Sequence, residues 1–190
     1  MTQTKFTADF TEHRISSELV FDGGLLKLRR DKIRLPDGGT ALREYVEHPG
    51  AAMVLAFMDA DTVLLERQYR YPHGRHFIEL PAGRLEPDEA PLATAKRELI
   101  EECGYEASEW WEIATLTPSI GYSNEVIILY GARGLTHVGA RPDVGEHLET
   151  IPVRLDEALA WVRDGIITDT KSCFGLMWWS LWGGRRGGGG

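Results

Sequence analysis

The sequence predicts an α/β protein of the α+β kind, in which a small antiparallel β lobe precedes a larger domain of strands and helices. Three observations support this fold class. Strand-like runs separated by turn residues fill residues 14–45. Residues 88–103 carry apolar side chains at helical spacing. Two further amphipathic helix patterns follow at 155–164 and 168–182, joined at Gly165.

The N-terminal lobe is predicted from its turns. Residues 20–26 place two apolar runs around a Gly-Gly pair, and residues 36–39 read Pro-Asp-Gly-Gly. Glycine, proline and aspartate favour tight turns because of their backbone geometry and local hydrogen bonding. We therefore expect three short antiparallel strands between residues 14 and 45.

Short apolar runs predict the strands of the larger domain. Each is four to eight residues long and is bounded by turn residues, which is typical of strands. The runs are residues 51–58, 62–69, 77–80, 110–116, 125–132 and 150–153.

Composition excludes several classes of protein. The chain has 190 residues and a formal net charge of −8, and it lacks the long basic stretch that binding to the nucleic-acid backbone requires. No apolar run approaches the ~20 residues of a membrane-spanning helix, and the polar N-terminus carries no secretion signal. Two cysteines are too few for a disulfide framework. We therefore expect a cytoplasmic protein that binds neither nucleic acid nor membrane.

Residues 88–103 show the clearest helix pattern. Pro87 or Asp88 suits its start, which would put Glu89 in the first turn, where the helix dipole favours a carboxylate. Gly104 suits its end. Spacing of three to four residues predicts a buried face, made by Leu92, Ala95, Leu99 and Cys103.

Three glutamates lie on one side of this helix. Glu98, Glu101 and Glu102 stand at positions i, i+3 and i+4, so their carboxylates repel one another. A solvated acidic face is one interpretation. A hard divalent cation is the other, because Mg²⁺ takes a few carboxylates together with substrate phosphate oxygens. Arg97, four residues before Glu101, is placed to hold that carboxylate.

The flanking glycines favour the metal. From Gly83 to Tyr105 the sequence reads G-x5-E-x7-R-E-L-x-E-E-x-G-Y, which resembles the Nudix hydrolase box at every specified position. The resemblance implies an α/β/α sandwich with a mixed sheet, and hydrolysis of a nucleoside diphosphate linkage with Mg²⁺, for which Mn²⁺ substitutes. It also implies that Glu98 and Glu102 are the main metal ligands, that Glu101 serves a second metal or the attacking water, and that the carbonyl of Ala82 completes the site. Glu89 would then be a structural carboxylate.

The segments around the box resemble the ADP-ribose pyrophosphatase branch of the family and its relatives that act on nucleoside diphosphate sugars. They are residues 43–50, 65–72 and 79–83. This resemblance implies cleavage of ADP-ribose to AMP and ribose 5-phosphate, and a homodimer in which the N-terminal lobe exchanges with a partner subunit. One departure is Ile120, which stands where the branch often has proline. Other Nudix substrates (NADH, GDP-mannose or a damaged nucleoside triphosphate) remain open, as does a non-catalytic metabolite sensor.

The same resemblance implies contacts with the substrate. Arg43 and Arg70 would bind the diphosphate or the terminal ribose phosphate, or else they are surface strand arginines. Glu79 would bind a ribose hydroxyl or the adenine edge, or it is a charge at the end of a strand. Phe21 would stack on adenine from the neighbouring subunit or pack in the core.

The resemblance also implies that the general base lies on the loop at residues 141–147, and that Glu146 on this loop reaches the metals. Glu146 is the first candidate, with Asp143 and Glu149 as alternatives. The expected organisation is a dimerising β lobe at 1–47, a Nudix domain at 48–182 and a flexible tail at 183–190.

Overall fold

The computed structural model describes residues 8–142, 145 and 147–183. The chain forms two compact units, which are described separately. The first comprises Met1–His48 with Ser119–Glu125, and the second Pro49–Pro118 with Val126–Gly190. The tail predicted at 183–190 falls, from residue 184 onward, outside the described residues.

The first unit is an antiparallel sheet of three strands, as the turn residues predict. Strands β1 (His13–Asp22), β2 (Lys27–Arg34) and β3 (Thr40–Glu47) pair in the order β1-β2-β3. Gly38, in the turn between β2 and β3, has a φ of 86°, which only glycine adopts at little cost. The loop at 119–125 joins this unit through β3, where the amide of Val46 donates to the carbonyl of Tyr122 at 2.8 Å.

The second unit contains two small sheets. One has the order β7-β4-β9-β8 and the other β10-β5-β6. Strands β4 and β9 run parallel and the remaining pairs are antiparallel, so the first of these sheets is mixed. The strands are β4 (Ala51–Ala56), β5 (Thr62–Arg70), β6 (Arg75–Glu79), β7 (Ala82–Arg84), β8 (Tyr105–Leu116), β9 (Ile127–His137) and β10 (Leu148–Arg154), and a 3-10 turn η1 (Tyr71–His73) joins β5 to β6.

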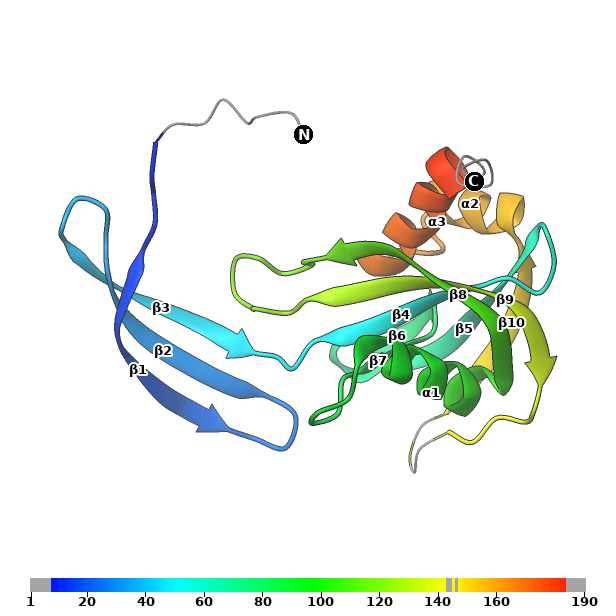
Figure 1. Ribbon diagram of the computed structural model, residues 1–190, viewed down its shortest axis with the longest axis horizontal. Helices are drawn as coiled ribbons and strands as arrows, with labels where there is room; N and C mark the ends of the chain where they lie inside the picture. Colours follow the sequence, from blue (N-terminus) through cyan, green and yellow to red (C-terminus); the bar gives the residue numbers. More distant parts are fainter. Residues whose placement is uncertain (1–7, 143–144, 146, 184–190) are drawn as a thin grey trace. The chain divides into compact units, whose positions relative to one another are not determined.

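Helices cover both sides of these strands. Helix α1 (Pro91–Cys103) lies on one side, and α2 (Leu155–Arg163) and α3 (Thr170–Trp182) lie on the other (Figure 1). Each side has its own apolar core. Val54, Leu64 and Leu99 belong to the core under α1, and Leu55, Leu65 and Leu176 to the core under α3. The α/β/α sandwich with a mixed sheet is therefore confirmed. Within the described residues, no helix is long and apolar enough to cross a membrane.

Helix α1 starts later than the sequence predicts. Asp88 has a left-handed φ of 63° and cannot begin a right-handed helix. The helix begins instead at Pro91, whose fixed φ and missing N–H suit the first helical position. The placement of Glu89 in the first turn is therefore wrong, because this residue lies in the loop before the helix. The predicted end at Gly104 is confirmed, with a φ of 75° and its amide bonded back to Ile100.

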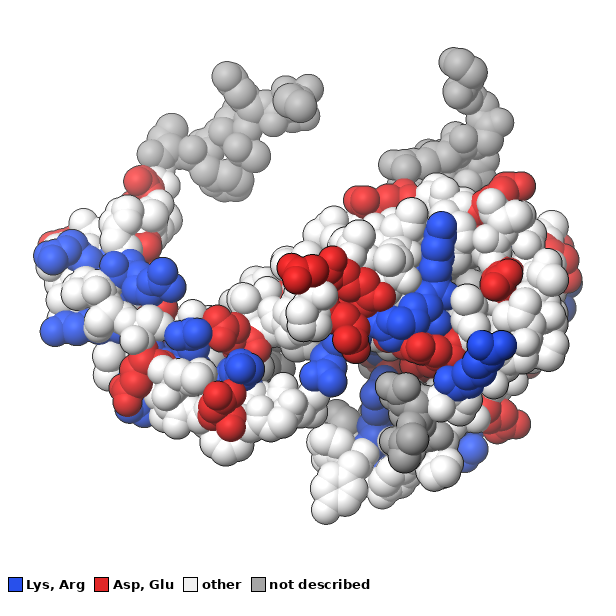
Figure 2. Space-filling model, turned by 60° about the horizontal axis from the view of Figure 1, so that its bottom comes forward, with Lys and Arg blue, Asp and Glu red and all other residues white. Residues whose placement is uncertain are grey.

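Charges of both signs are interspersed on one face of the second unit. On the face shown in Figure 2, lysines and arginines alternate with acidic side chains and do not form a continuous basic stripe. This distribution agrees with the acidic composition and does not favour binding along a nucleic-acid backbone.

Candidate active site

Arg97 joins the loop before α1 to the glutamates of the helix. Its Nε and Nη2 donate to the two carboxylate oxygens of Glu89, both at 3.0 Å. Its Nη1 donates to Glu98 at 2.7 Å and to Glu101 at 2.9 Å. Nη2 also donates to the carbonyl of Arg84 at 3.2 Å. The bonds to these carboxylates raise the pKa of Arg97, so its charge permanently offsets part of the acidic cluster.

Two of the three helix glutamates are buried beside strand β7. Glu98 is 9% exposed and Glu102 is 5% exposed. The amide of Ala82 donates to Glu102 Oε2 at 3.1 Å. A β-carbon added to Gly83 would lie 1.7 Å from Glu98 Oε1, so glycine is required for Glu98 to approach this strand. The structure thus places Glu102 against Ala82 and Glu98 against Gly83, while the metal-ligand role of the Ala82 carbonyl stays a prediction.

A fourth carboxylate, which sequence analysis did not single out, lies beneath them. Glu66 on β5 is fully buried, and Gln68 donates to one of its oxygens. Its other oxygen, Oε2, has no hydrogen-bond partner. Burial first, and then the charge of Glu79, raises the pKa of Glu66 to about 7, while the neighbouring Glu102 and Gln68 oppose this rise. Glu98, Glu102 and Glu66 thus form a buried acidic centre that extends from α1 to β5.

These residues fit a divalent cation. Burial of several carboxylates close together costs free energy unless positive charge compensates them. One oxygen of Glu66 has no hydrogen-bond partner among the described protein groups. Among the residues the structure describes, no three acidic, His or Cys side chains are placed to hold a metal ion together. Mg²⁺ does not need such a group of three, because it is bound by one or two carboxylates together with water and substrate phosphates.

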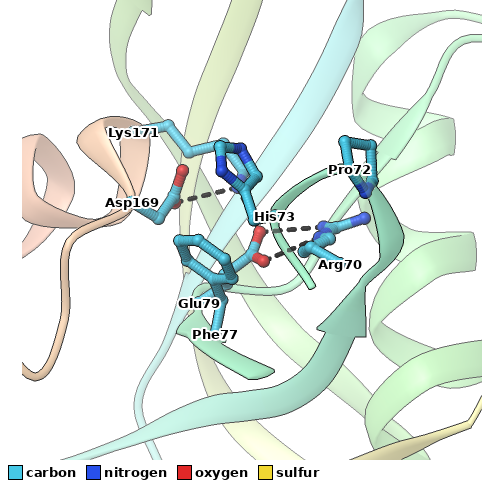
Figure 3. A pocket seen from close by; sticks show the side chains of 7 residues that line it. All are labelled: Arg70, Pro72, His73, Phe77, Glu79, Asp169 and Lys171. Atoms are coloured by element: carbon cyan, nitrogen blue, oxygen red, sulfur yellow. Dashed lines mark hydrogen bonds and ion pairs between the residues drawn. The ribbon is translucent and has the colours of Figure 1, made fainter. Parts of the chain in front are cut away.

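Arg70 and Glu79, predicted separately as substrate contacts, form one pair. Arg70 Nε and Nη2 donate to the two oxygens of Glu79 at 2.7 and 2.8 Å. Burial would raise the pKa of Glu79, but Arg70 and Lys171 outweigh burial and hold that pKa at about 2. The pair lines a pocket of about 280 Å³ (Figure 3). The charge of Glu102 also acts on Arg70, so the pocket and the acidic centre are electrostatically connected.

The other predicted substrate contacts belong to the first unit. Arg43 on β3 is exposed, and its guanidinium pairs with Glu12. Phe21 on β1 is 56% exposed. A core role for Phe21 is therefore not supported, whereas its stacking on a ligand stays a prediction.

The described residues include one of the three candidates for the general base. Glu146 and Asp143 lie outside the described residues. Glu149 lies on β10 and forms an ion pair with Arg67 at 3.8 Å. Its neighbour Thr150 bonds to the carbonyl of Glu102 on α1. Because successive strand residues point to opposite faces, Glu149 points away from α1, and this geometry disfavours it as the base.

The residues that sequence analysis missed carried weak signals. Glu66 interrupts the apolar run Val63-Leu64-Leu65, and strand alternation places it on the same face as Leu64 under α1. Asp169, which lines the pocket beside Arg70, stands immediately before α3 and caps it by accepting from the amide of Ser172, and aspartate is a favoured residue at that position. Neither position predicts a partner on another strand from sequence alone.

Low pH should reduce the contribution of ionised Glu89, in the loop before α1, to the stability of the protein. Hydrogen bonds from Arg97, and then from Thr94 and the amide of Glu86, lower the pKa of Glu89 from 4.5 to about 2. A lowered pKa in the folded state means that ionised Glu89 stabilises the protein fully above about pH 4.5, and that this contribution disappears as the pH falls towards 2. We therefore expect the thermal midpoints of wild type and Glu89→Gln to differ at neutral pH and to converge through this window. A difference that stays constant with pH would contradict this assignment.

Comparison with known proteins shows the family of the chain. The NUDIX domain model matches residues 47–169, and the model of the nucleoside diphosphate sugar hydrolase N-terminal domain matches residues 12–46. The chain therefore belongs to the Nudix hydrolase family. This confirms the family that the box from Gly83 to Tyr105 indicates, and with it a hydrolase.

Individual relatives cover nearly the whole chain. A "methanol dehydrogenase activator" of Bacillus methanolicus is 38% identical over 174 residues, which is 90% of this chain and 94% of that protein. An "ADP-ribose pyrophosphatase" of Bacillus subtilis is 34% identical over 172 residues, covering 90% of this chain and 93% of its own. The crystal structure of an ADP compounds hydrolase has a TM-score of 0.83 at 19% identity, covering 95% of this chain and 99% of the other. At 19% identity, the likeness to this crystal structure is evidence for the fold alone.

Proposed function

We propose that the chain is a Mg²⁺-dependent ADP-ribose diphosphatase, which cleaves ADP-ribose to AMP and ribose 5-phosphate. The observation that carries the proposal is the pairing of a buried acidic centre, Glu98 and Glu102 beside Ala82, with an arginine-lined pocket at Arg70. The first suits a divalent cation and the second an anionic ligand. A relative called ADP-ribose pyrophosphatase that aligns over 90% of the chain supports this substrate.

Each residue has a role in that reaction. Glu98 and Glu102 would hold Mg²⁺, with the Ala82 carbonyl as a further ligand, and Glu101 would orient the attacking water. Arg97 keeps Glu98 and Glu101 in place through its bonds to both. When bound, the cation neutralises charge that develops on the diphosphate and lowers the pKa of the attacking water. Glu146 removes the proton of that water.

Arg70 binds the diphosphate. Its guanidinium keeps a fixed orientation because two of its five N–H groups are bonded to Glu79. A planar guanidinium held in this way offers its remaining donors to phosphate oxygens in a defined geometry. Arg43, and Phe21 of a neighbouring subunit, are further proposed nucleotide contacts. Glu79 is only 3% exposed and acts through the orientation of Arg70.

A substrate panel tests the proposal. Purified protein with Mg²⁺ is incubated with ADP-ribose, GDP-mannose, ADP-glucose, NADH and 8-oxo-dGTP, and kcat/KM is measured for each. We expect ADP-ribose to be cleaved with the highest kcat/KM. A higher value for another member would refute the substrate assignment while leaving the hydrolase in place. Tight binding of ADP-ribose without turnover of any compound would favour a metabolite sensor.

We also propose a homodimer formed through the first unit. Strand β1 is exposed along its whole length, and its apolar side chains Ile15, Leu19 and Phe21 are 46%, 40% and 56% exposed. Exposed apolar side chains on an edge strand are characteristic of a surface that another chain covers. Light scattering should give twice the 21.3 kDa mass of the chain, and a monomeric mass at micromolar concentration would refute the dimer.

A further inference from the structure

The first turn of α3 reaches the carboxylate that orients Arg70. Lys171 donates from Nζ to Glu79 Oε2 and, at 2.8 Å, to Asp169 Oδ2. The Lys171 side chain is 17% exposed and that of Glu79 only 3%. In Figure 3, Arg70 approaches Glu79 from one side while Lys171 and Asp169 lie on the other. Glu79 is thus held by two cations that come from different elements.

The same turn is anchored to the strand end that leads to the metal centre. Ser172 is fully buried, and its hydroxyl accepts from the amide of Leu80 at 2.8 Å. Asp169 Oδ2 in turn accepts from the amide of Ser172 at 3.0 Å and from its hydroxyl. Leu80 stands two residues before Ala82. These bonds give Lys171 a fixed position relative to β6 and the segment that follows it.

The charges around the pocket are balanced. Arg70 and Lys171 carry two positive charges, and Glu79 and Asp169 carry two negative charges, so the four groups sum to zero. Loss of Lys171 would leave a net charge of −1, which repels an anionic diphosphate. Among these four groups, Arg70 would then be the only cation in direct contact with Glu79. The carboxylate would therefore draw the guanidinium towards itself and away from the pocket.

We propose that Lys171 is a positioning residue for diphosphate binding: it neutralises and fixes Glu79, so that the free N–H groups of Arg70 point into the pocket. The Arg70 side chain is 40% exposed, whereas its partner Glu79 is almost fully covered, so the open end of the ion pair is the guanidinium. The inference rests on the proposed function through the role of Arg70 as a phosphate contact. Lys171 does not touch the reacting atoms, and its effect is on affinity.

Two measurements on Lys171→Met test this role. The first is kcat and KM with ADP-ribose and Mg²⁺. The second is the Kd of ADP by calorimetry in the same buffer, which reports diphosphate binding without turnover. We expect KM and Kd to rise about tenfold, the size of one charge-assisted hydrogen bond, while kcat changes less than about threefold. Lys171→Arg keeps the charge and should restore both constants. Lys96→Met removes an exposed lysine of α1 and should change neither.

The outcomes separate this inference from the proposed function. Unchanged KM and Kd in Lys171→Met, a loss confined to kcat, no recovery in Lys171→Arg, or equal weakening in Lys96→Met would each overturn it. If the wild type cleaves no ADP-ribose but Lys171→Met still weakens ADP binding, the positioning role stands and the proposed function fails. A wild type that neither cleaves ADP-ribose nor binds ADP would refute both. Should Lys171→Met not fold, judged by its thermal midpoint, Lys171→Gln takes its place with the same expectations.

Discussion

Replacement of Glu102 by glutamine is expected to reduce kcat for ADP-ribose by about 1,000-fold or more. Glu102 is buried and is fixed by the Ala82 amide at 3.1 Å, and in the proposed function its carboxylate holds Mg²⁺. Glutamine keeps the shape but loses the charge that a hard cation requires. Metal stabilisation of charge in the transition state is worth several kcal/mol, and about 4 kcal/mol corresponds to a thousandfold in rate.

A matched control tests whether the loss of any one carboxylate lowers the activity. Glu109→Gln makes the same substitution on an exposed position of β8 and should leave kcat and KM unchanged. Both variants should fold, because glutamine at position 102 can accept the same bond from the Ala82 amide and position 109 is exposed. Retention of more than about a tenth of the activity in Glu102→Gln would show that this carboxylate does not hold the catalytic metal.

Addition of one methyl group at Gly83 should be nearly as damaging. The β-carbon of Gly83→Ala would lie 1.7 Å from Glu98 Oε1 and 1.9 Å from its carboxyl carbon, so the Glu98 side chain must move. A displacement of about 1 Å in a catalytic arrangement can cost about 100-fold in rate. We therefore expect kcat to fall by about that factor, with a higher Mg²⁺ concentration needed for half-maximal activity.

Gly24→Ala is the control for this substitution. No atom lies within 4 Å of the position its β-carbon would take, and its backbone is not in the left-handed region. The two variants should have similar thermal midpoints, because the clash at Gly83 involves a side chain that can turn and not the backbone. Full activity of Gly83→Ala would mean that the observed position of Glu98 is not the one used in catalysis.

Most of what could be predicted about the acidic centre came from the helix pattern of residues 88–103. The spacing of Glu98, Glu101 and Glu102 follows from helix geometry alone, and so does the buried face that contains Ala95 and Leu99. The same local logic failed at the helix start. The helix propensity of aspartate allows Asp88 to begin a helix. In the structure Asp88 has a left-handed φ, and the helix begins at Pro91.

Contacts between distant segments could not be predicted in the same way. Arg70, Glu79 and Lys171 come from two strands and a helix, and 92 residues separate Glu79 from Lys171. Their meeting depends on the pairing of β5 with β6 and on the packing of α3, neither of which leaves a local pattern. Glu66 was missed for a related reason, since an acid in an apolar strand resembles an edge position until the sheet order shows that β5 lies between β10 and β6.

The products formed from ADP-ribose test the central claim most directly. Protein and ADP-ribose are incubated with Mg²⁺ or with EDTA, and the products are separated and quantified by chromatography. The proposed function predicts AMP and ribose 5-phosphate in equal amounts with Mg²⁺, and neither compound with EDTA. Any other product pair, or the same yield of AMP in EDTA, would contradict metal-dependent cleavage of the diphosphate bond by this site.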